Sequence, residues 1–335
     1  MSLDAGRLMA LLDDFGRVRL LVLGDLVLDE YVSGDVERIS PEAPVPVVHV
    51  RDESLALGGA GNVARNVVAL GGQAALCSLV GDDAAGRSAA ELLEKLGVDP
   101  RGLVAVEGRA TPRKTRVVAR SQQIVRFDRE TLEPAPPDAE AELRAGIERA
   151  LAACDAVVVA DYGKGALSAG LAAEVMAQCR SRRLPVILDP KAALLPWRGV
   201  ALVKPNLREA EALSGVAIHG AADLARAATA LRDALDGAQV VVTRGMEGMT
   251  LFEGGAAGVE VGTLARDVFD VQGAGDTVSA ALALALRAGA SLLEAAVLAN
   301  TAAGVVVGKV GTATASRDEV RALLPAAVAA AGAVS

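Results

Sequence analysis

The sequence predicts an α/β protein with a doubly wound, mostly parallel sheet and helices on both faces. Short runs of aliphatic and β-branched residues alternate with alanine-rich stretches along the 335 residues. The apolar runs are continuous, which is typical of strands buried on both faces of a parallel sheet. Regular alternation of such strands with helices favours a layered α/β fold that binds ligands at the carboxyl ends of its strands.

The expected elements follow one another in a simple order. We expect buried strands at residues 20–23, 74–79, 156–160, 186–188, 201–203 and 240–243. Helical patterns between them include residues 139–154, 169–182 and 221–236. Asp161, Asp189 and Asn206 come just after three of these strands. Since parallel strands end at a common edge of the sheet, these side chains should share one site.

Composition favours a soluble cytoplasmic enzyme. A net charge of −8 argues against general nucleic-acid binding. No apolar run is long enough to span a membrane, and the first residues lack the basic and apolar regions of a secretion signal. The three cysteines, Cys77, Cys154 and Cys179, lie in apolar surroundings. We therefore expect reduced core thiols and no metal site built on them.

The most informative segment is residues 270–277, which read DVQGAGDT and precede a small-residue helix at 278–286. Glycines before a helix let backbone N–H groups converge on an anion, and the helix dipole favours negative charge there. A carboxylate beside phosphate is unfavourable unless it is used chemically. We expect Asp276 to accept a hydroxyl proton while the loop stabilises a transferring phosphoryl group. The alternative is that Asp276 is an ordinary helix-start residue.

A second glycine-rich segment, residues 57–66, reads LGGAGNVARN and leads into a helix expected at 63–70. Glycine permits close backbone approach to a ligand, and Asn62 can hydrogen-bond sugar hydroxyls. The segment also fits a relaxed dinucleotide fingerprint, with Asp82 at about the required distance of twenty residues. The strand-like run at 45–50 ends too early for the tight turn of that motif, so a Rossmann dehydrogenase is the less favoured alternative.

A third glycine-containing segment is discarded as a phosphate loop. Residues 81–88, GDDAAGRS, are one residue short of a Walker A loop and carry Arg87 where lysine is required. Two acidic side chains inside a phosphate cradle would also repel the ligand.

Together, the first two motifs resemble the two signatures of ribokinase-like (PfkB) carbohydrate kinases. Between them, the segments DYGKG, DPK, KPNLRE and TRGMEG occur in the family's order at 161–165, 189–191, 204–209 and 243–248. The resemblance covers about residues 18–325. It implies an ATP-dependent kinase that uses Mg²⁺, folded as one domain over residues 1–335. Two extended segments, 31–50 and 111–128, would build a small β lid over the sugar, and related enzymes often dimerise through it.

Further segments resemble the heptose 7-phosphate kinase branch of the family: GDLVLD at 24–29, RISPEAPVPV at 38–47, SQQIVR at 121–126 and AGVVVGK at 303–309. A nucleotidyltransferase domain often follows such a kinase. Here the sequence ends at Ser335, and His49 and His219 do not form the His-x-Gly-His motif of that domain. We therefore expect a stand-alone kinase.

The branch implies phosphorylation of the anomeric hydroxyl of a heptose 7-phosphate, on the path to lipopolysaccharide. Two alternatives stay open. One is a kinase of another sugar, such as ribose, fructose or an aminated hexose. The other is a catalytically silent sugar-binding regulator, which would have no need of Asp276 beside the glycine loop.

The motifs also suggest roles for individual residues. Asp276 would be the base, and the backbone around Gly273, Ala274 and Gly275, together with the N–H of Asp276, would form the anion hole. Sugar hydroxyls would be contacted by Asp29, Gly58, Gly59 and Asn62.

On the nucleotide side, Asn206 and Glu209 are spaced to hold Mg²⁺ through water, although a helix cap with a solvated glutamate explains them too. The nucleotide channel would be lined by Thr243, Gly245 and Gly248. Asn300 would lie near the adenine or serve helix packing. The family often binds a monovalent cation such as K⁺, for which Asp270 and carbonyls near Gly308 would be the ligands.

The second lid segment is strongly basic. In a strand, Lys114, Arg116 and Arg120 would share one face, and Lys164 and Lys191 would add positive charge near the sheet. Such donors suit the phosphate of a substrate that is already phosphorylated. The alternative is an edge strand that uses charge to avoid aggregation.

Overall fold

A computed structural model describes residues 3–119, 122–191, 194–254, 257–263, 270–309 and 311–332. Within them, one large sheet has the strand order β13-β12-β11-β10-β9-β8-β1-β4-β5. In that order the strands are Val259–Val261, Met249–Phe252, Gln239–Thr243, Leu202–Val203, Val186–Asp189, Ala156–Ala160, Arg19–Gly24, Gln73–Gly81 and Leu103–Val106. All six strands expected from the sequence are present in this sheet.

The sheet is parallel from β11 to β5, and only β12 and β13 pair antiparallel. From β1 the chain moves outward through β4 to β5 and then returns to β8, on the other side of β1. The order therefore reverses between β1 and β8. In open α/β sheets, ligands bind beyond the carboxyl ends of the strands at such a reversal.

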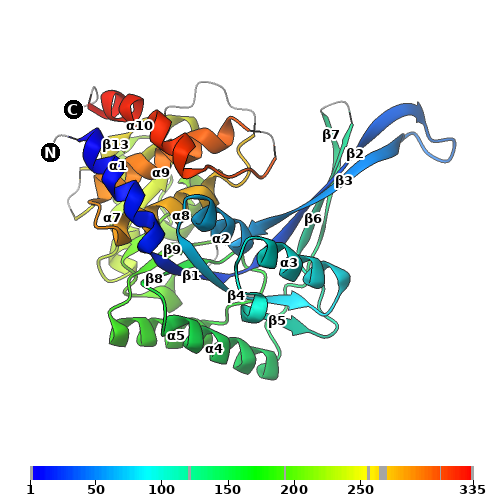
Figure 1. Ribbon diagram of the computed structural model, residues 1–335, viewed down its shortest axis with the longest axis horizontal. Coiled ribbons are helices and arrows are strands. Elements are labelled where there is room, and N and C mark those ends of the chain that lie inside the picture. Colours follow the sequence, from blue (N-terminus) through cyan, green and yellow to red (C-terminus); the bar gives the residue numbers. More distant parts are fainter. Residues whose placement is uncertain are drawn as a thin grey trace.

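Helices cover both faces of the sheet (Figure 1). Leu20 and Val22 of β1 pack into one core, and Leu21 and Leu23 pack into the other, as a strand's alternation requires. The first core is covered by α1 (Ala5–Asp14), α2 (Ala60–Ala69), α3 (Ala84–Lys95), α8 (Ala274–Arg287), α9 (Leu292–Val307) and α10 (Arg317–Gly332). The second is covered by α4 (Pro137–Leu151), α5 (Ala169–Arg182), α6 (Leu207–Ser214) and α7 (Ala221–Ala234).

Ten consecutive residues of helix α8, Asp276 to Ala285, are buried. Alanine and leucine occupy every position from 280 to 285, and all six are buried. Small side chains let α8 pack closely against α9 and α2. The first turn of α8, which carries Asp276, therefore belongs to a helix that is packed into the core. Four short 3₁₀ turns complete the described helices, at Phe15–Arg17, Pro100–Gly102, Leu195–Trp197 and Gly245–Glu247.

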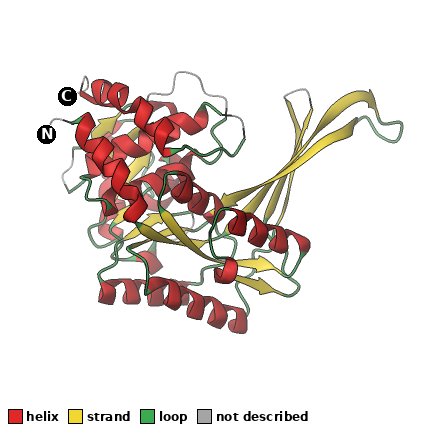
Figure 2. Cartoon of the chain, in the orientation of Figure 1, coloured by secondary structure: helices red, strands yellow, loops and turns green. Residues whose placement is uncertain are grey.

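A separate four-stranded sheet, here called the lid, projects from the main body (Figures 1 and 2). Its order is β3-β2-β6-β7, with strands Pro46–Gly59, Leu26–Ile39, Arg113–Ala119 and Gln122–Arg129. This confirms the expected fold class with its small β sheet. Strands β2 and β3 extend beyond the expected segment 31–50. Strand β2 begins earlier, because it follows β1 after a single residue, Asp25, and β3 ends later, at Gly59.

The expected gap between a strand at 45–50 and the following helix is wrong. Strand β3 runs on to Gly59 and joins α2 directly, so that this helix begins at Ala60. The dinucleotide alternative still does not apply. The strands on either side of α2, β3 and β4, lie in different sheets, whereas a Rossmann unit needs them parallel in one sheet.

The discarded Walker-like segment is an ordinary helix start. The carboxylate of Asp83 caps α3 by accepting the Gly86 N–H at 2.7 Å. Of the three free cysteines, Cys77 and Cys179 are buried and Cys154 is partly buried, as expected for core thiols. No helix in the described part of the chain has the length and apolar character that a membrane crossing demands.

Candidate active site

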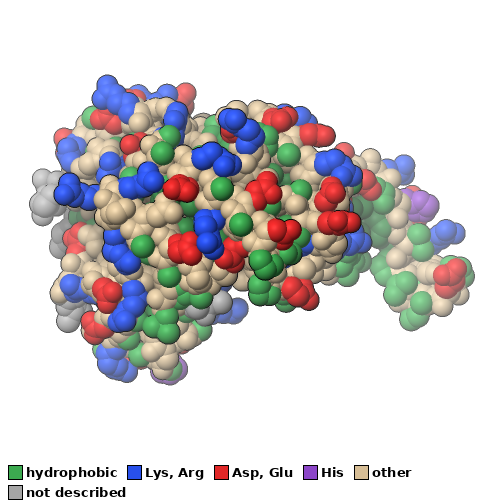
Figure 3. Space-filling model, turned by 90° about the horizontal axis from the view of Figure 1, so that it is seen from below, with side chains coloured by type: hydrophobic (Ala, Val, Ile, Leu, Met, Phe, Trp, Pro, Cys, Tyr) green, Lys and Arg blue, Asp and Glu red, His purple; other side chains and the backbone are tan. Residues whose placement is uncertain are grey.

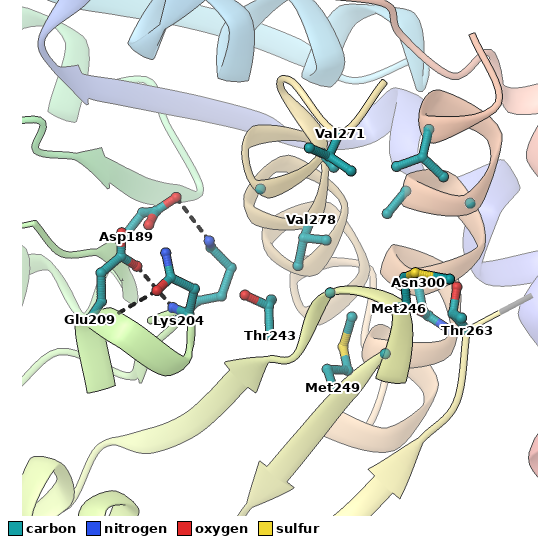
Figure 4. A pocket seen from close by; sticks show the side chains of 18 of the residues that line it. Asp189, Lys204, Glu209, Thr243, Met246, Met249, Thr263, Val271, Val278 and Asn300 are labelled. Carbon is teal, nitrogen blue, oxygen red and sulfur yellow. Dashed lines mark hydrogen bonds and ion pairs between the residues drawn. The ribbon is translucent and has the colours of Figure 1, made fainter. Parts of the chain in front are cut away.

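A cavity of about 470 Å³ opens at the carboxyl ends of the central strands. Asp189 at the end of β9, Lys204 just after β10 and Thr243 at the end of β11 form part of its wall. The first turn of α8 and the C-terminal half of α9 close the other side. Figure 4 shows Asp189, Lys204 and Glu209 on one side, Thr263 and Asn300 on the other, and Thr243 between them. Of the three strand-end residues expected to share one site, Asp189 and Asn206 line this cavity, whereas Asp161 is not among its lining residues.

The glycine loop before α8 has the conformation that its sequence requires. Gly273 has a φ of +75°, and a Cβ there would lie 2.6 Å from Asn62 Nδ2, so only glycine fits. The Ala274 N–H, expected in the anion hole, donates a long bond of 3.3 Å to the Val271 carbonyl. Within the described residues, the N–H groups of Gly275 and Asp276 have no partner. They are the first-turn donors available to an anion.

Asp276 is buried and is held by two donors. The Asn62 amide donates to Oδ2 at 2.8 Å, and the Tyr162 hydroxyl donates to Oδ1. Burial raises the pKa of the Asp276 carboxyl to about 6, although both hydrogen bonds oppose this rise. A carboxylate with a pKa near neutrality is suited to accept and release protons at physiological pH.

Hydrogen bonds join the two glycine-rich motifs. Asn66 donates to the carbonyl of Asn62 at 2.9 Å, and its own Oδ1 accepts from the Thr277 hydroxyl at 2.8 Å. Thr277 follows Asp276 directly, so α2 and α8 are fixed to one another beside the carboxylate. Segments more than 200 residues apart in the sequence thus form one site.

A buried lysine, Lys204, was not assigned a role from the sequence. Its Nζ lies 3.0 Å from Asp189 Oδ2, and the two side chains are 3% and 5% exposed. The Ser279 hydroxyl donates to the same Asp189 oxygen at 3.0 Å. A Cβ on Gly275 would lie 3.6 Å from Lys204 Nζ, so the ammonium group abuts the glycine loop. The signal in the sequence was a lysine placed directly after a buried strand.

Asn206 and Glu209 form a capping box at the start of α6. Asn206 Oδ1 accepts the Glu209 N–H at 3.0 Å, and Glu209 Oε2 accepts the Asn206 N–H at 2.8 Å. Glu209 Oε1 also pairs with Lys191. The helix cap, which was the alternative explanation for Asn206 and Glu209, is thus present. No group of three or more histidine, cysteine, aspartate or glutamate side chains in the described ranges could bind a metal directly.

The residues expected on the nucleotide side line the same cavity. Gly248 has a φ of +82°, and a Cβ there would lie 2.0 Å from the Val261 carbonyl oxygen, so this tight turn needs glycine. Asn300 faces the cavity, and its amide donates to the Gly262 carbonyl at 2.7 Å. Asn300 therefore ties α9 to the end of β13 and also contributes to the cavity wall. Thr243 and Gly245 lie on the wall beside them.

On the lid side, Asp29 is buried and paired with Arg116. The guanidinium Nη1 lies 2.7 Å from Asp29 Oδ1. A Cβ on Gly58 would lie 2.5 Å from Asp29 Oδ2, and one on Gly59 would lie 2.4 Å from the Asp25 carbonyl oxygen. Gly58 therefore leaves room for the Asp29 carboxylate, and Gly59 leaves room for the Asp25 carbonyl.

Most of the cations expected to bind a phosphate are already paired. Arg116 pairs with Asp29, Lys164 with Glu130 at 2.7 Å, and Lys191 with Glu209. Lys114 is partly exposed and forms no ion pair among the described residues. Arg120 lies outside the described residues. Lys114 is therefore the expected cation whose charge is most available to a ligand.

Asp270, the expected ligand of a monovalent cation, joins two loops. Its Oδ1 accepts the Gln272 N–H at 2.9 Å, and its Oδ2 accepts the Gly311 N–H at 3.2 Å. The Asp270 N–H donates to the Val307 carbonyl at 3.3 Å. These bonds hold the glycine loop against the end of α9, near Gly308.

Comparison with known proteins agrees with this geometry. A family model described as pfkB family carbohydrate kinase matches residues 19–319. The chain belongs to this family. The expected activity, that of an ATP-dependent carbohydrate kinase acting on a small-molecule sugar, is thereby confirmed, and the Rossmann dehydrogenase alternative falls away.

The curated relatives include proteins with the name bifunctional protein HldE. The protein from Geobacter sulfurreducens is 47% identical over 306 residues, which cover 91% of this chain and 62% of that protein. The protein from Pelobacter propionicus is 45% identical over 310 residues, covering 91% and 64%. The chain thus spans less than two thirds of the length of these relatives.

Solved structures show the same fold at low identity. Escherichia coli phosphofructokinase-2 in complex with potassium has a TM-score of 0.78 and 22% identity, covering 92% of this chain and 99% of that one. Arabidopsis thaliana ribokinase complexed with ribose and ATP has a TM-score of 0.71 and 22% identity, covering 92% and 98%.

Proposed function

We propose that this kinase transfers the γ-phosphate of ATP to the anomeric hydroxyl of a heptose 7-phosphate, a precursor of lipopolysaccharide. The proposed phosphoryl transfer is supported by the position of Asp276. This buried carboxylate lies in the first turn of α8, beside two unpaired backbone N–H groups. The observation that favours the substrate is the 47% identity to a protein named HldE. A kinase of another sugar is the alternative.

In this proposal the moving phosphoryl group lies at the start of α8. The N–H groups of Gly275 and Asp276 stabilise its negative charge, as preorganised donors do in a site shielded from water. Lys204, whose ammonium group abuts Gly275, supplies the positive charge that a Walker lysine supplies elsewhere. The nucleotide occupies the cavity, with Thr243, Gly245 and Gly248 beside its phosphates or ribose and Asn300 towards its base.

The sugar lies between the lid and α8. Asp29 and Asn62 contact its hydroxyls, and Gly58 and Gly59 let the backbone approach it. Asp276 takes the proton of the attacking hydroxyl, whose oxygen then forms the new bond to phosphorus as the bond to ADP breaks. The lid shields the reacting groups from water, which would otherwise hydrolyse ATP. Lys114 reaches the phosphate that the sugar already carries.

The donor set fits Mg²⁺ held through water. Each oxygen of Glu209 already accepts one hydrogen bond, but a carboxylate oxygen can accept a second. Glu209 and Asn206 therefore suit the outer shell of a hydrated ion that is bound mainly by the nucleotide phosphates. When bound, the ion neutralises phosphate charge. Each oxygen of Asp270 likewise accepts one backbone N–H and keeps a further acceptor position. A K⁺ requirement is part of the proposal only through the family resemblance.

The lid is proposed as the contact of a homodimer. Apolar side chains are exposed along it (Figure 3). On β7, Val125 and Phe127 are 49% and 50% exposed, and Ile124 is 38% exposed. Exposed apolar groups that gather on one element are typical of a surface covered by a partner. Sedimentation of the purified protein tests this point, since a monomer at micromolar concentration contradicts it.

A coupled ADP-release assay over a panel of sugars tests the function. The panel contains heptose 7-phosphate, fructose 6-phosphate, ribose, fructose and an aminated hexose. We expect kcat/KM for heptose 7-phosphate to exceed that of the neutral sugars by about 100-fold, the worth of a charge-assisted phosphate contact. A neutral sugar as the best substrate would leave a sugar kinase but reject the phosphorylated substrate. No sugar-dependent ADP release would support a silent binding protein.

A further inference from the structure

Tyr162 connects the cavity to the proposed base. Its side chain lines the cavity, and its hydroxyl donates to Asp276 Oδ1. Burial, followed by the nearby Asp276 charge, raises the pKa of the Tyr162 phenol well above its usual value. The hydroxyl therefore stays protonated and remains a donor. The Lys191 ammonium lies 5.3 Å from the centre of the ring, which adds a cation–π contact on the phenol's face.

The loop that carries Tyr162 is clamped from two sides. The buried Asp25 carboxylate accepts three of its backbone N–H groups, those of Tyr162 at 2.8 Å, Lys164 at 3.1 Å and Ala166 at 3.0 Å. The buried Arg109 guanidinium donates to the Lys164 carbonyl and, at 2.9 Å, to the Glu133 carbonyl. Gly163 and Gly165 take positive φ angles of 67° and 83°, which the tight path of the loop needs.

The clamp also determines where the Tyr162 side chain points. A buried carboxylate that accepts three backbone donors fixes the direction of the Cα–Cβ bond at Tyr162, and with it the reach of the phenol. The phenol has few rotamers, so that a fixed backbone places its hydroxyl at one point. That point lies within hydrogen-bond reach of Asp276 Oδ1.

We propose that Tyr162 is a positioning residue for the reaction: its hydroxyl, aimed by the Asp25 clamp, fixes the orientation of the Asp276 carboxylate and keeps it ionised for the sugar hydroxyl. The inference rests on the proposed function, because it takes Asp276 as the base. Tyr162 and Asn62 each occupy one acceptor position on Asp276. A carboxylate has further acceptor positions, so the substrate hydroxyl can bind without displacing either donor.

Other charges face Asp276 and must be counted in a pH experiment. Asp189, at the end of β9, favours its protonated form, and Lys204, after β10, favours its ionised form. Lys191 and Arg65 are further cations whose charges interact with it. None of these four groups is altered by removing the Tyr162 hydroxyl. A hydrogen bond donated to a carboxylate stabilises the ionised form, so its loss should raise the pKa of Asp276.

The test is the variant Tyr162→Phe, with Tyr31→Phe as the matched control. The chain has only two tyrosines, and the Tyr31 hydroxyl donates to Gln272 at 2.7 Å and not to Asp276. The measurement is kcat/KM against pH for the best sugar of the panel, with ATP saturating. For Tyr162→Phe we expect the acid limb to move up by about one pH unit and the plateau kcat to fall by about 10- to 100-fold, with the KM for ATP unchanged. For Tyr31→Phe we expect the acid limb to stay where the wild type has it.

A second variant, Asp25→Asn, keeps the phenol and loosens the clamp. It should move the acid limb in the same direction by a smaller amount. An unmoved acid limb in Tyr162→Phe, whatever its plateau rate, would overturn the positioning role and leave Tyr162 a packing residue. An equal shift in Tyr31→Phe would also overturn it. Failure of the proposed function is seen separately, as substantial activity in Asp276→Asn.

Discussion

The ammonium group of Lys204 lies 3.0 Å from the carboxylate of Asp189, directly beneath the glycine loop that starts α8. Both side chains are almost completely buried, and together they carry no net charge. The pair thus keeps a cation next to the anion site with a smaller desolvation penalty than a lone buried charge would have. When the phosphates of ATP arrive, Lys204 can share its remaining donors with them.

Lys204→Met should reduce both activity and stability. We expect kcat/KM for ATP to fall by about 100- to 1000-fold, because charge on the moving phosphoryl group is no longer neutralised. The free energy of unfolding should fall by about 3–5 kcal/mol, because Asp189 is left buried without its cation. Steady-state kinetics and chemical denaturation measure the two effects.

The double variant Asp189→Asn, Lys204→Met is the control, because it removes both charges. It should recover most of the stability, since no unpaired charge remains, but not the activity. Recovery of more than a tenth of wild-type kcat/KM in the double variant would show that Lys204 serves only to pair with Asp189.

The raised pKa of Asp276, about 6, predicts how stability depends on pH. Because the folded protein holds this proton more tightly than the unfolded chain, the carboxyl favours folding at low pH, and this contribution is lost as pH rises through about 6. Asp276→Asn resembles the protonated form. It should therefore be more stable than the wild type at pH 8, by up to about 3 kcal/mol, and show no such gain at pH 4. Denaturation at both pH values checks this, and an equal difference at the two would contradict the raised pKa.

Substitutions of Lys114 and Arg116 should have different effects on phosphorylated and neutral sugars. Lys114→Ala should raise the KM for a sugar phosphate by about tenfold while leaving neutral sugars and ATP unaffected, because it removes a phosphate contact only. Arg116→Ala frees Asp29 and should impair phosphorylated and neutral sugars alike. The measurement is KM for each substrate type with both variants. A uniform effect of Lys114→Ala on all sugars would exclude its role in binding the phosphate.

Activity should require Mg²⁺ or Mn²⁺, and Glu209→Gln should raise the metal concentration needed for half-maximal activity. Glutamine at this position can keep the capping box of α6, so that the substitution removes the charge and retains the helix start. A titration of activity with Mg²⁺ compares the two proteins. Full activity in excess chelator, or identical titrations, would reject Glu209 as part of the metal site.

The sequence was most informative where one physical cause dominates. Strands such as β8 and β9 are buried on both faces, and their continuous apolar runs predicted them well. Strands β5, β12 and β13, which lie towards the two ends of the strand order, were not predicted. Short apolar runs of this kind do not differ from loop or helix segments by periodicity.

The sequence predicted the backbone features of the site better than its side-chain contacts. Glycines with fixed roles marked the loop at Gly273 and the approach at Gly58. Side-chain pairing was not visible, because the partners are distant in sequence: Arg116 meets Asp29 across 87 residues, and Tyr162 meets Asp276 across 114. A motif places a residue near the site, but only the packed fold decides which neighbour compensates its charge.

The most direct test of Asp276 as the base is single-turnover phosphoryl transfer by Asp276→Asn. Asparagine keeps the size of the side chain and removes the proton acceptor. Rapid quench of enzyme with labelled ATP and heptose 7-phosphate would measure the rate of the chemical step, and calorimetry would measure ATP binding. We expect the rate to fall by about two to four orders of magnitude while ATP binding persists. A variant that keeps more than about a tenth of the wild-type rate would show that Asp276 is not the base.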